Sequence, residues 1–439
     1  MFSRRNRRPK TPELLKAWEA LDEGDIPGAL RQLRHGADDL PLGEVALVVA
    51  RAAGAAGFQD LHEAADALAA RPEKPRALYD FGYACIERGV PHLAIPALRV
   101  ALNQAPESVA VLRELVSAYE REGRHREASD LLAARESGLT DWPDRYLLVY
   151  NALMSGDLAL ARRQHARLSD PDDAMWLPTQ ARQRRMLDRA VSAEPVSPLD
   201  RGDLRGWQYV IGGTVLGSMS PYGFDAGMAG RYAWLQDSHG QCLRGLLRLK
   251  AVLDAAGVRP ASVSLLPDRS SRILGLAAAE VLQLPAEPFT STREDTVVVA
   301  YDLNEVAAAD EGPDIIGGLY ERAPGQVLHE HASNWTDPPV VTADSVALLH
   351  QSATAPWEGQ LRADDDGSVE RGAPDDRPER EIAADILAAD ASPDEGDGQT
   401  PADGAEALTD FVSAVRDSWL RGDRAGLTSS GPVASSRFL

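Results

Sequence analysis

Residues 78–104 of this chain read LYDFGYACIERGVPHLAIPALRVALNQ, and residues 112–138 read LRELVSAYEREGRHREASDLLAARESG. The two stretches repeat one apolar pattern at an offset of roughly 34 positions. Within each stretch the apolar residues recur at steps of three and four, which places their side chains on one stripe of a helix. Each stretch therefore predicts two short helices packed against each other. The positions that carry the pattern are Leu78, Phe81, Gly82, Cys85, Ala94, Leu98, Ala101 and Pro106 in the first stretch and Leu112, Leu115, Val116, Tyr119, Ala128 and Leu132 in the second.

Small residues mark the turns and the close contacts of this pattern. Gly89 and Gly123 stand where the first helix of each stretch must turn into the second, and Gly82 stands where the two helices must approach closely. A helix–turn–helix unit of about 34 residues resembles the tetratricopeptide repeat (TPR). The resemblance implies a stack of units that holds peptides or partner proteins. The alternative is a generic array of helical hairpins.

Weaker copies of the pattern flank these two stretches. Residues 11–34 begin with Thr-Pro-Glu, which is typical of a helix start, and residues 43–69 and 146–168 have helical apolar spacing. A TPR-like helical repeat domain of about five hairpins is therefore expected over residues 11–190, because single hairpins cannot bury their apolar faces alone. The additional turns are expected at Gly24, Gly57 and Gly156.

The TPR resemblance also implies which side chains contact a partner. Arg76 and Arg113 would grip a carboxylate or an acidic peptide, and Tyr79 and Tyr83 would supply rigid contact area. The alternative is that these residues are only a solvated face and core positions. The full set of implied partner-binding residues is Arg76, Tyr79, Tyr83, Glu87, Arg113, Ser117, Glu120, Arg121 and Asn151.

Composition excludes some classes of function. The net charge of −21 argues against sequence-independent nucleic-acid binding, which relies on basic surfaces. No run of about 20 apolar residues is present, so we expect no membrane span, and the basic N-terminus lacks the apolar stretch of a secretory signal. The two cysteines, Cys85 and Cys242, do not form a disulfide framework, so a cytoplasmic protein is expected. Lysine is scarce beside abundant arginine, alanine and aspartate, a composition that suggests a bacterial source.

The ends of the chain and one internal stretch differ from the rest. We expect a disordered basic tail over residues 1–10 and an acidic disordered linker over residues 361–402, because neither can bury enough apolar area to order itself. An amphipathic helix is expected over residues 403–425, followed by a disordered tail over residues 426–439. This helix is expected to dock back on the body of the protein or on a partner. Its apolar stripe consists of Leu408, Phe411, Val412, Val415 and Trp419.

The middle of the chain alternates strand and helix patterns. Helices are expected over residues 240–256 and from Arg269 to Leu282. This alternation predicts an α/β layer domain with a mainly parallel sheet over residues 205–360. The expected strands are residues 207–211, 232–235, 263–266 and 296–301.

Part of this domain, residues 205–350, is similar to type I phosphoribosyltransferases. A strand is followed by a Pro-Asp-Arg-Ser-Ser-Arg loop and a helix, and a second strand ends in TVVVAYD. In that family the first loop holds pyrophosphate and an acidic pair after the second strand binds ribose hydroxyls. Here Tyr301-Asp302 replaces the acidic pair, and Glu305 stands in place of a phosphate loop and would repel phosphate. The resemblance implies a degenerate site at Arg269, Ser270, Ser271, Arg272 and Asp302.

Other motifs of the α/β domain favour ordinary structural roles. The glycines from Gly212 to Gly217 have Walker-like spacing, but no lysine precedes Ser218 to hold phosphates. Nothing in the spacing of Asp268, Ser270 and His239 supports a nucleophile system, and no Gly-x-Ser-x-Gly signature is present. No catalytic residues are therefore assigned.

His329 and His331 raise the possibility of a metal site. Alternate residues of a strand point the same way, so both imidazoles would share one face. The pair lacks helical His-Glu-x-x-His spacing, and a third ligand would have to be His350 or Asp344. We expect partly exposed strand histidines and neither a metal nor a cofactor.

These observations favour a protein–protein interaction scaffold or adaptor. Its TPR-like groove would bind a partner peptide or protein, and the α/β domain behind it is expected to be non-catalytic. One alternative is a phosphoribosyltransferase-like enzyme, or a binder of nucleotides or sugar phosphates, that requires magnesium. Another is an autoinhibited switch in which the acidic linker and the C-terminal helix cover the groove or the α/β face.

Overall fold

The computed structural model describes residues 8–426, apart from 35, 37 and 364–367, together with residues 431–435. The chain divides into two compact units. Unit 1 contains the chain up to Ser155 together with Ala159–Ser169, and unit 2 contains Gly156–Leu158 and the chain from Asp170 onward. Each unit is described by itself below.

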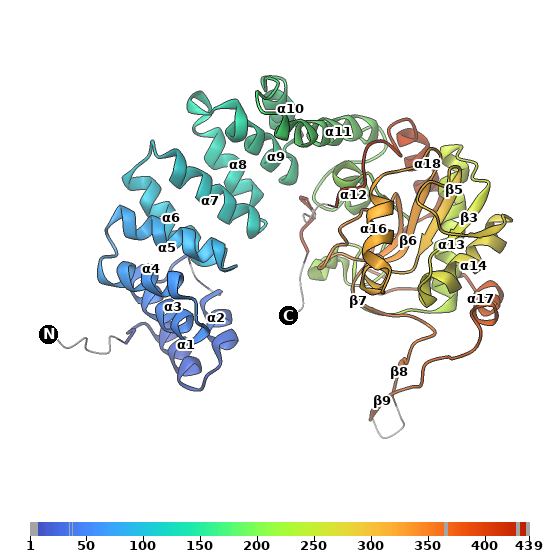
Figure 1. Ribbon diagram of the computed structural model, residues 1–439, viewed down its shortest axis with the longest axis horizontal. Helices are drawn as coiled ribbons and strands as arrows, with labels where there is room; N and C mark the ends of the chain where they lie inside the picture. The colour runs from blue at the N-terminus through green and yellow to red at the C-terminus, as the bar shows by residue number, and fades with distance from the viewer. Residues whose placement is uncertain (1–7, 35, 37, 364–367, 427–430, 436–439) are drawn as a thin grey trace. The chain divides into compact units, whose positions relative to one another are not determined.

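Unit 1 is an array of helical hairpins, drawn from blue to green in Figure 1. Consecutive helices pack against one another along the chain, as the apolar pattern predicts. The expectation of an all-helical N-terminal part is confirmed. The helices are α1 (Pro12–Asp22), α2 (Ile26–Arg34), α3 (Leu42–Ala56), α4 (Gln59–Ala70), α5 (Pro75–Glu87), α6 (Pro91–Gln104), α7 (Val109–Arg121), α8 (His125–Ala133), α9 (Tyr146–Met154) and α10 (Leu158–His165).

Glycines with positive φ set the period of this array. One such glycine recurs roughly every 33 positions, each time at the turn between the two helices of a hairpin. The left-handed backbone conformation is readily adopted only by glycine, so these residues fix where each first helix ends. The turn glycines are Gly24 (φ 84°), Gly57 (φ 79°), Gly89 (φ 74°), Gly123 (φ 67°) and Gly156 (φ 81°).

Gly82 permits the close approach of α5 and α6. A Cβ atom at this position would lie 2.5 Å from Leu98 Cγ, well inside van der Waals contact. Leu98 is fully buried, as are Leu78 and Phe81 on the same side of α5. The predicted core of this hairpin is confirmed.

The first hairpin also reaches beyond its neighbour in sequence. Helix α2 contacts α6, Arg34 forms an ion pair with Glu122 at 3.3 Å, and Arg124 lies 3.1 Å from Asp38. In an open repeat stack each unit touches only the adjacent units. Unit 1 is therefore more tightly wound than such a stack.

Unit 2 is built on a seven-stranded sheet in which neighbouring strands run parallel. The strand order is β1-β7-β6-β5-β3-β4, and β2 also pairs with β7. The expected mainly parallel α/β sheet is confirmed. The strands are β1 (Val215–Leu216), β2 (Tyr232–Gln236), β3 (Ser262–Leu265), β4 (Ala286–Pro288), β5 (Thr296–Ala300), β6 (Val327–Asn334) and β7 (Ser345–Thr354), and a separate antiparallel pair consists of β8 (Leu361–Ala363) and β9 (Val369–Arg371).

Helices cover the sheet, and the direction in which the chain adds strands to the sheet reverses between β3 and β5. Helix α14 (Arg269–Leu282) packs on β3 and β5, whereas α15 (Leu303–Ala308) follows β5 and packs on β6. The chain moves from β3 outward to β4, but from β5 it moves the other way to β6. The carboxyl ends of β3 and β5 therefore flank a topological switch point, where open α/β sheets bind ligands. The other helices of unit 2 are α11 (Leu177–Ala193), α12 (Leu204–Gly212), α13 (His239–Ala256), α16 (Gly312–Tyr320), α17 (Glu379–Ala388) and α18 (Ala405–Val415).

The predicted strand at residues 207–211 is wrong, because this segment lies in α12. The Asp203 side chain accepts a hydrogen bond from Gly206 N at 2.9 Å and caps the helix, and Gly213 ends it at φ 78°. Trp207 and Ile211 are both buried. A short apolar run that is buried all round has no period with which to distinguish a helix from a strand.

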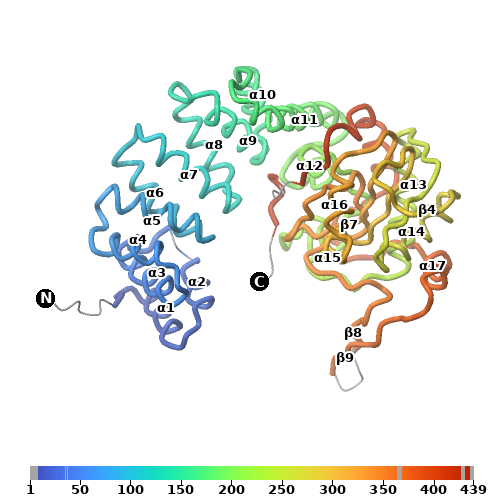
Figure 2. The backbone as a smooth tube through the Cα atoms, viewed as in Figure 1, coloured from blue at the N-terminus to red at the C-terminus, as the bar shows by residue number. Residues whose placement is uncertain are grey.

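The prediction of disorder over residues 361–402 is wrong for residues 379–388, which form α17. This helix packs on α14 (Figure 2) and buries Ile382, Ala383 and Ile386. The acidic composition of the stretch conceals these few apolar residues. Residues 364–367 of the same stretch lie outside the described residues.

The C-terminal helix docks on unit 2. Helix α18 packs on α13 and α11, and all five residues of its predicted stripe are buried. It ends at Val415, earlier than expected, and the following segment is anchored by Trp419 Nε1, which donates to Asp344 O at 3.0 Å. Residues 431–435 of the predicted disordered tail include Val433, which is buried. Most of the predicted basic tail, residues 1–7, lies outside the described residues.

Candidate functional site

A pair of tyrosines on α5 forms the most exposed aromatic surface of unit 1. Tyr79 and Tyr83 are one helical turn apart, and their rings stack with centroids 6.4 Å apart and an interplanar angle of 19°. Tyr83 is 47% exposed, and Tyr79 is half-buried. Two stacked rings held on a helix offer a flat, rigid surface to a ligand.

Acidic side chains lie beside these rings. Burial raises the pKa of Glu114 on α7, and the nearby charge of Glu87 on α5 raises it further. Arg121 lies close enough to lower that pKa, but its guanidinium donates to Ile86 O at 3.0 Å. Two glutamates therefore lie beside the tyrosines against Arg121, which is already engaged, while the charges of Arg76 and Asp80, which also act on Tyr79, offset each other as an ion pair. We call Tyr79, Tyr83, Glu87, Glu114 and Arg121 the tyrosine–glutamate face.

The two arginines expected to grip a carboxylate are bound within the protein. Arg113 donates to both carboxylate oxygens of Asp144, at 2.7 and 3.2 Å, and Asp144 is buried. Arg76 is exposed and pairs with Asp80 of the same helix at 2.8 Å. The bidentate bond of Arg113 fills the geometry that a ligand carboxylate would need. Arg113 is therefore already occupied, whereas Arg76 keeps an exposed guanidinium.

Glu120 and Asn151 belong to a buried polar network. Asn151 donates to Glu120 Oε1 at 2.6 Å, and its Oδ1 lies 3.0 Å from His125 Nδ1. Burial raises the pKa of Glu120 to about 6. These residues join α7, α8 and α9 from within, so they are not available to a partner. Ser117 is half-buried on α7.

Three more aromatic rings of unit 1 stack in a row over residues 142–150, and the sequence patterns do not predict this contact. Trp142 stacks on Tyr146 at 5.5 Å, and Tyr146 stacks on Tyr150 at 6.5 Å. The signal was present as aromatic residues at steps of four. Tyr146 is buried, whereas Trp142 and Tyr150 are half-buried, so the ladder is mainly an internal contact.

The switch point of unit 2 brings together part of the predicted phosphate site. The side chain of Asp268 accepts from Ser271 N at 2.9 Å, and Ser271 Oγ accepts from Tyr301 N at 3.0 Å. Ser270 Oγ accepts from the indole of Trp357 at 3.1 Å. These donors and hydroxyl groups at the start of α14 therefore bind the protein itself.

The remaining predicted phosphate ligands are also engaged. Arg269 donates to the carbonyls of Asp375 and Arg377 at 2.6 and 3.0 Å, and Arg272 lies 3.8 Å from Glu379. Asp302 caps α15 by accepting from Asn304 N at 2.8 Å. The two arginines thus fasten the segment before α17.

The switch point is acidic. Burial raises the pKa of Glu305 to about 7, with smaller contributions from Asp302 and Glu358. Burial also raises the pKa of Glu330 to about 8, and Asp302 adds to that shift. A phosphate would be repelled here, and the buried Trp357 covers the crevice through its contacts with Ser270 and Tyr301. This arrangement does not favour a sugar phosphate.

His331 lies in a buried polar cluster at the same end of the sheet. Its Nε2 is 2.9 Å from Asp237 Oδ2, which also accepts from Tyr301 Oη at 3.0 Å and from Cys242 Sγ at 3.4 Å. All four side chains are at most 2% exposed. We call Asp237, Cys242, Tyr301 and His331 the Asp237 cluster; the carboxylate, thiol and imidazole are all of types that bind metals.

The structure corrects two expectations about the histidines. His329 and His331 are buried, not partly exposed, because β6 is an interior strand of the sheet. The candidate third ligands lie elsewhere: His350 Nε2 is 3.7 Å from Asp302, and Asp344 pairs with Arg424 at 2.8 Å. The sequence does not identify Asp237 and Cys242 as neighbours of His331, because they precede it by about 90 positions and only the crossovers bring them together.

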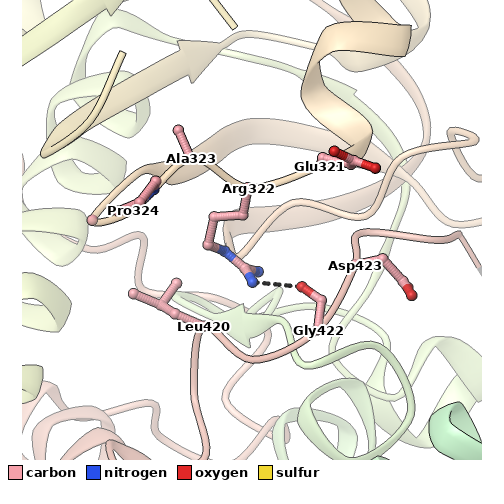
Figure 3. Close-up of a pocket in the computed structure, with 8 residues that line it drawn as sticks. Glu321, Arg322, Ala323, Pro324, Leu420, Gly422 and Asp423 are labelled. Carbon is pink, nitrogen blue, oxygen red and sulfur yellow. Dashed lines mark hydrogen bonds between the residues drawn. The ribbon is translucent and has the colours of Figure 1, made fainter. Parts of the chain in front are cut away.

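A cavity of about 460 Å³ lies at the opposite, amino-terminal end of the sheet (Figure 3). It is formed by the segment before β6 and by the chain that follows α18. Arg322 projects between Leu420 and Asp423 and donates to Gly422 O at 2.7 Å. Arg322 also pairs with Asp344, so its charge is already balanced within the protein. The cavity therefore offers a ligand no strong electrostatic anchor.

Comparison of the sequence with protein-family models and with curated proteins finds no match. Among the residues that the structure describes, no helix is long and apolar enough to span a membrane. The candidate sites must therefore be judged on their own geometry and charge.

Proposed function

We propose that the chain is a protein-interaction adaptor whose TPR-like hairpin array binds a segment of a partner protein on the tyrosine–glutamate face. The observation that carries the proposal is the stacked Tyr79–Tyr83 pair, with Tyr83 47% exposed beside two glutamates. The glycine period of about 33 positions supports the TPR-like assignment.

The charge of this face favours a basic ligand over the acidic peptide expected from the sequence. The charge of Glu87 raises the free energy of the charged form of Glu114, and a cation placed beside them would relieve that repulsion. Arginine or lysine also packs favourably on an exposed tyrosine ring. We therefore propose a partner segment that presents arginine or lysine next to apolar residues.

The test uses two fluorescent peptide pools and the full chain. One pool alternates arginine with leucine and proline, and the other has glutamate in place of arginine. We expect the arginine pool to bind more tightly, as measured by fluorescence anisotropy at 50 and 200 mM salt. Equal affinity for both pools, or tighter binding of the glutamate pool, would contradict the proposed charge preference.

Variants locate the binding surface. Tyr83→Ala and Glu114→Gln should each weaken binding of the arginine pool about 5- to 30-fold, which corresponds to about 1–2 kcal/mol of lost contact. Tyr222→Ala is the matched control, because Tyr222 is a similarly exposed tyrosine (44%) in unit 2. If all three variants bind as the parent does, the partner segment does not use this face.

A further inference from the structure

We propose that the Asp237 cluster is a structural zinc site, with Asp237, Cys242 and His331 as ligands and Tyr301 as the fourth group. The site is independent of the proposed peptide surface, since all four residues belong to unit 2. Carboxylate, thiolate and imidazole are the ligand types that zinc takes in proteins, and this combination is typical of zinc rather than of calcium or magnesium.

Four separate elements bring the ligands to one point. Asp237 directly follows β2, Cys242 lies in the first turns of α13, Tyr301 directly follows β5, and His331 lies within β6. Cys242 reaches the sheet because α13 approaches it closely one turn later. A Cβ atom at Gly245 would lie only 2.7 Å from His331 Nδ1. A side chain at this position would push the helix and its cysteine away from the histidine.

The distances between donor atoms are close to those of a tetrahedral zinc site. With zinc bonds of about 2.0 Å to oxygen and nitrogen and about 2.3 Å to sulfur, donor atoms in a tetrahedron lie roughly 3.3–3.6 Å apart. Here Asp237 Oδ2 lies 3.4 Å from Cys242 Sγ, Cys242 Sγ lies 3.8 Å from His331 Nε2, and Asp237 Oδ2 lies 2.9 Å from His331 Nε2. The distance from Asp237 Oδ2 to His331 Nε2 must lengthen by roughly 0.4 Å, and the 3.0 Å from Tyr301 Oη to Asp237 Oδ2 by roughly 0.3 Å, while the distance from Cys242 Sγ to His331 Nε2 must shorten by roughly 0.2 Å.

One oxygen atom is the centre of the hydrogen bonds in the Asp237 cluster. Groups from Cys242, Tyr301 and His331 all converge on the single atom Asp237 Oδ2. Zinc would replace the hydrogen atoms directed at that oxygen: Cys242 and Tyr301 would each release a proton to solvent, and the imidazole proton of His331 would move from Nε2 to Nδ1. The Asp237 carboxylate holds the Nε2–H tautomer of His331, and His331 Nδ1 has no hydrogen-bond partner among the described residues, so the displaced proton meets no competing donor there.

The site is closed, which assigns it a structural rather than a catalytic role. Its residues are at most 2% exposed, and the Trp357 ring packs against Tyr301 with centroids 5.2 Å apart. Catalytic zinc keeps one position for water or substrate, whereas structural zinc is fully ligated by protein. The ion would fasten α13 to β5 and β6 and would be taken up as the chain folds.

The experiment measures metal in the full-length protein. We expect chain purified from zinc-supplemented cells to contain about one zinc per molecule by plasma mass spectrometry. Chain refolded with cobalt in place of zinc should show the intense visible bands of tetrahedral cobalt and a near-ultraviolet thiolate charge-transfer band. Folded parent protein that contains no zinc and shows no cobalt bands would overturn the proposal.

The two cysteines provide a matched pair of variants. Cys242→Ala should lose the zinc and the thiolate band, whereas Cys85→Ala should keep both, because Cys85 lies in the apolar core of unit 1. If Cys242→Ala does not fold, His331→Gln with Cys242 intact should keep a folded chain but lose the zinc. Zinc that persists in a folded Cys242→Ala or His331→Gln chain would place the metal elsewhere and contradict the assignment.

Discussion

Asp344 should be one of the most important single residues for the stability of unit 2. It lies at the amino end of β7 and is 4% exposed. Its carboxylate accepts from Arg424 at 2.8 and 3.1 Å, from Leu328 N at 2.9 Å and from Arg322. Through Arg424 it ties the segment after α18 to the sheet. Replacement by asparagine keeps the shape but removes the charge.

The expected cost follows from what the substitution leaves behind. Arg424 is 2% exposed, so Asp344→Asn leaves its charge buried without a counterion, and Arg322 loses the same partner. Breaking a buried ion pair by removing one partner destabilises a protein by about 3–5 kcal/mol. Arg189 lies near enough to sense both Arg322 and Asp344, so the remaining positive charges also repel one another.

The assay is guanidinium denaturation of the full chain followed by tryptophan fluorescence, which should report unit 2 through Trp419 and its bond to Asp344 O. The control is Asp423→Asn, which breaks the exposed pair with Arg185 and should cost less than about 1 kcal/mol. A further variant, Asp344→Leu with Arg424→Met and Arg322→Met, should recover much of the stability because it leaves neither arginine charge without its counterion. A loss below about 1 kcal/mol for Asp344→Asn alone would refute the reasoning.

The ion pairs of Asp344 with Arg424 and Arg322 should make the stability of unit 2 decrease at acid pH. Burial acts to raise the pKa of Asp344, but the charges of Arg424 and Arg322 prevail and hold the pKa below its usual range. Because the pKa is lower in the folded than in the unfolded state, this contribution is present above about pH 4 and is lost as the pH falls through the folded pKa. In the Asp344→Asn variant, the free energy of unfolding of unit 2 should therefore depend less on pH below about pH 4 than it does in the parent protein.

Two further substitutions test unit 1 by thermal or chemical unfolding. Gly82→Ala should destabilise the unit by about 1–3 kcal/mol, because the new methyl group would lie 2.5 Å from Leu98 Cγ. Gly138→Ala is the neutral control, because a methyl group there meets nothing within 4 Å. Equal melting temperatures for the two variants would contradict the close packing of α5 on α6. Burial raises the pKa of Glu120 to about 6, so the folded state binds the proton more tightly than the unfolded state. Stability should therefore fall by about 2 kcal/mol as the pH rises from about 4 to about 7, and Glu120→Gln should abolish that fall; an unchanged pH profile would show that Glu120 is not held in a buried setting.

The sequence by itself determined the local elements whose signal repeats or alternates. The turn glycines predict the hairpins of unit 1, since only glycine readily adopts the left-handed conformation that such turns need. The stripe from Leu408 to Trp419 is visible because one buried face of a helix recurs at steps of three and four. The strands at residues 263–266 and 296–301 are visible as short apolar runs that alternate with helices, because the strands of a parallel sheet are buried on both faces. The structure confirms the helical N-terminal part, the mainly parallel sheet and the docked C-terminal helix that these patterns predict.

Only the tertiary structure decided which side chains meet. The sequence predicts that Arg113 holds a ligand, but in the structure its guanidinium donates hydrogen bonds to Asp144, which follows in the next hairpin. Asp237 and Cys242 had no visible relation to His331, because the crossovers of the sheet bring them together across about 90 positions. Periodicity records which face of a segment is buried, but the identity of the partner on that face depends on topology, which the local pattern does not encode.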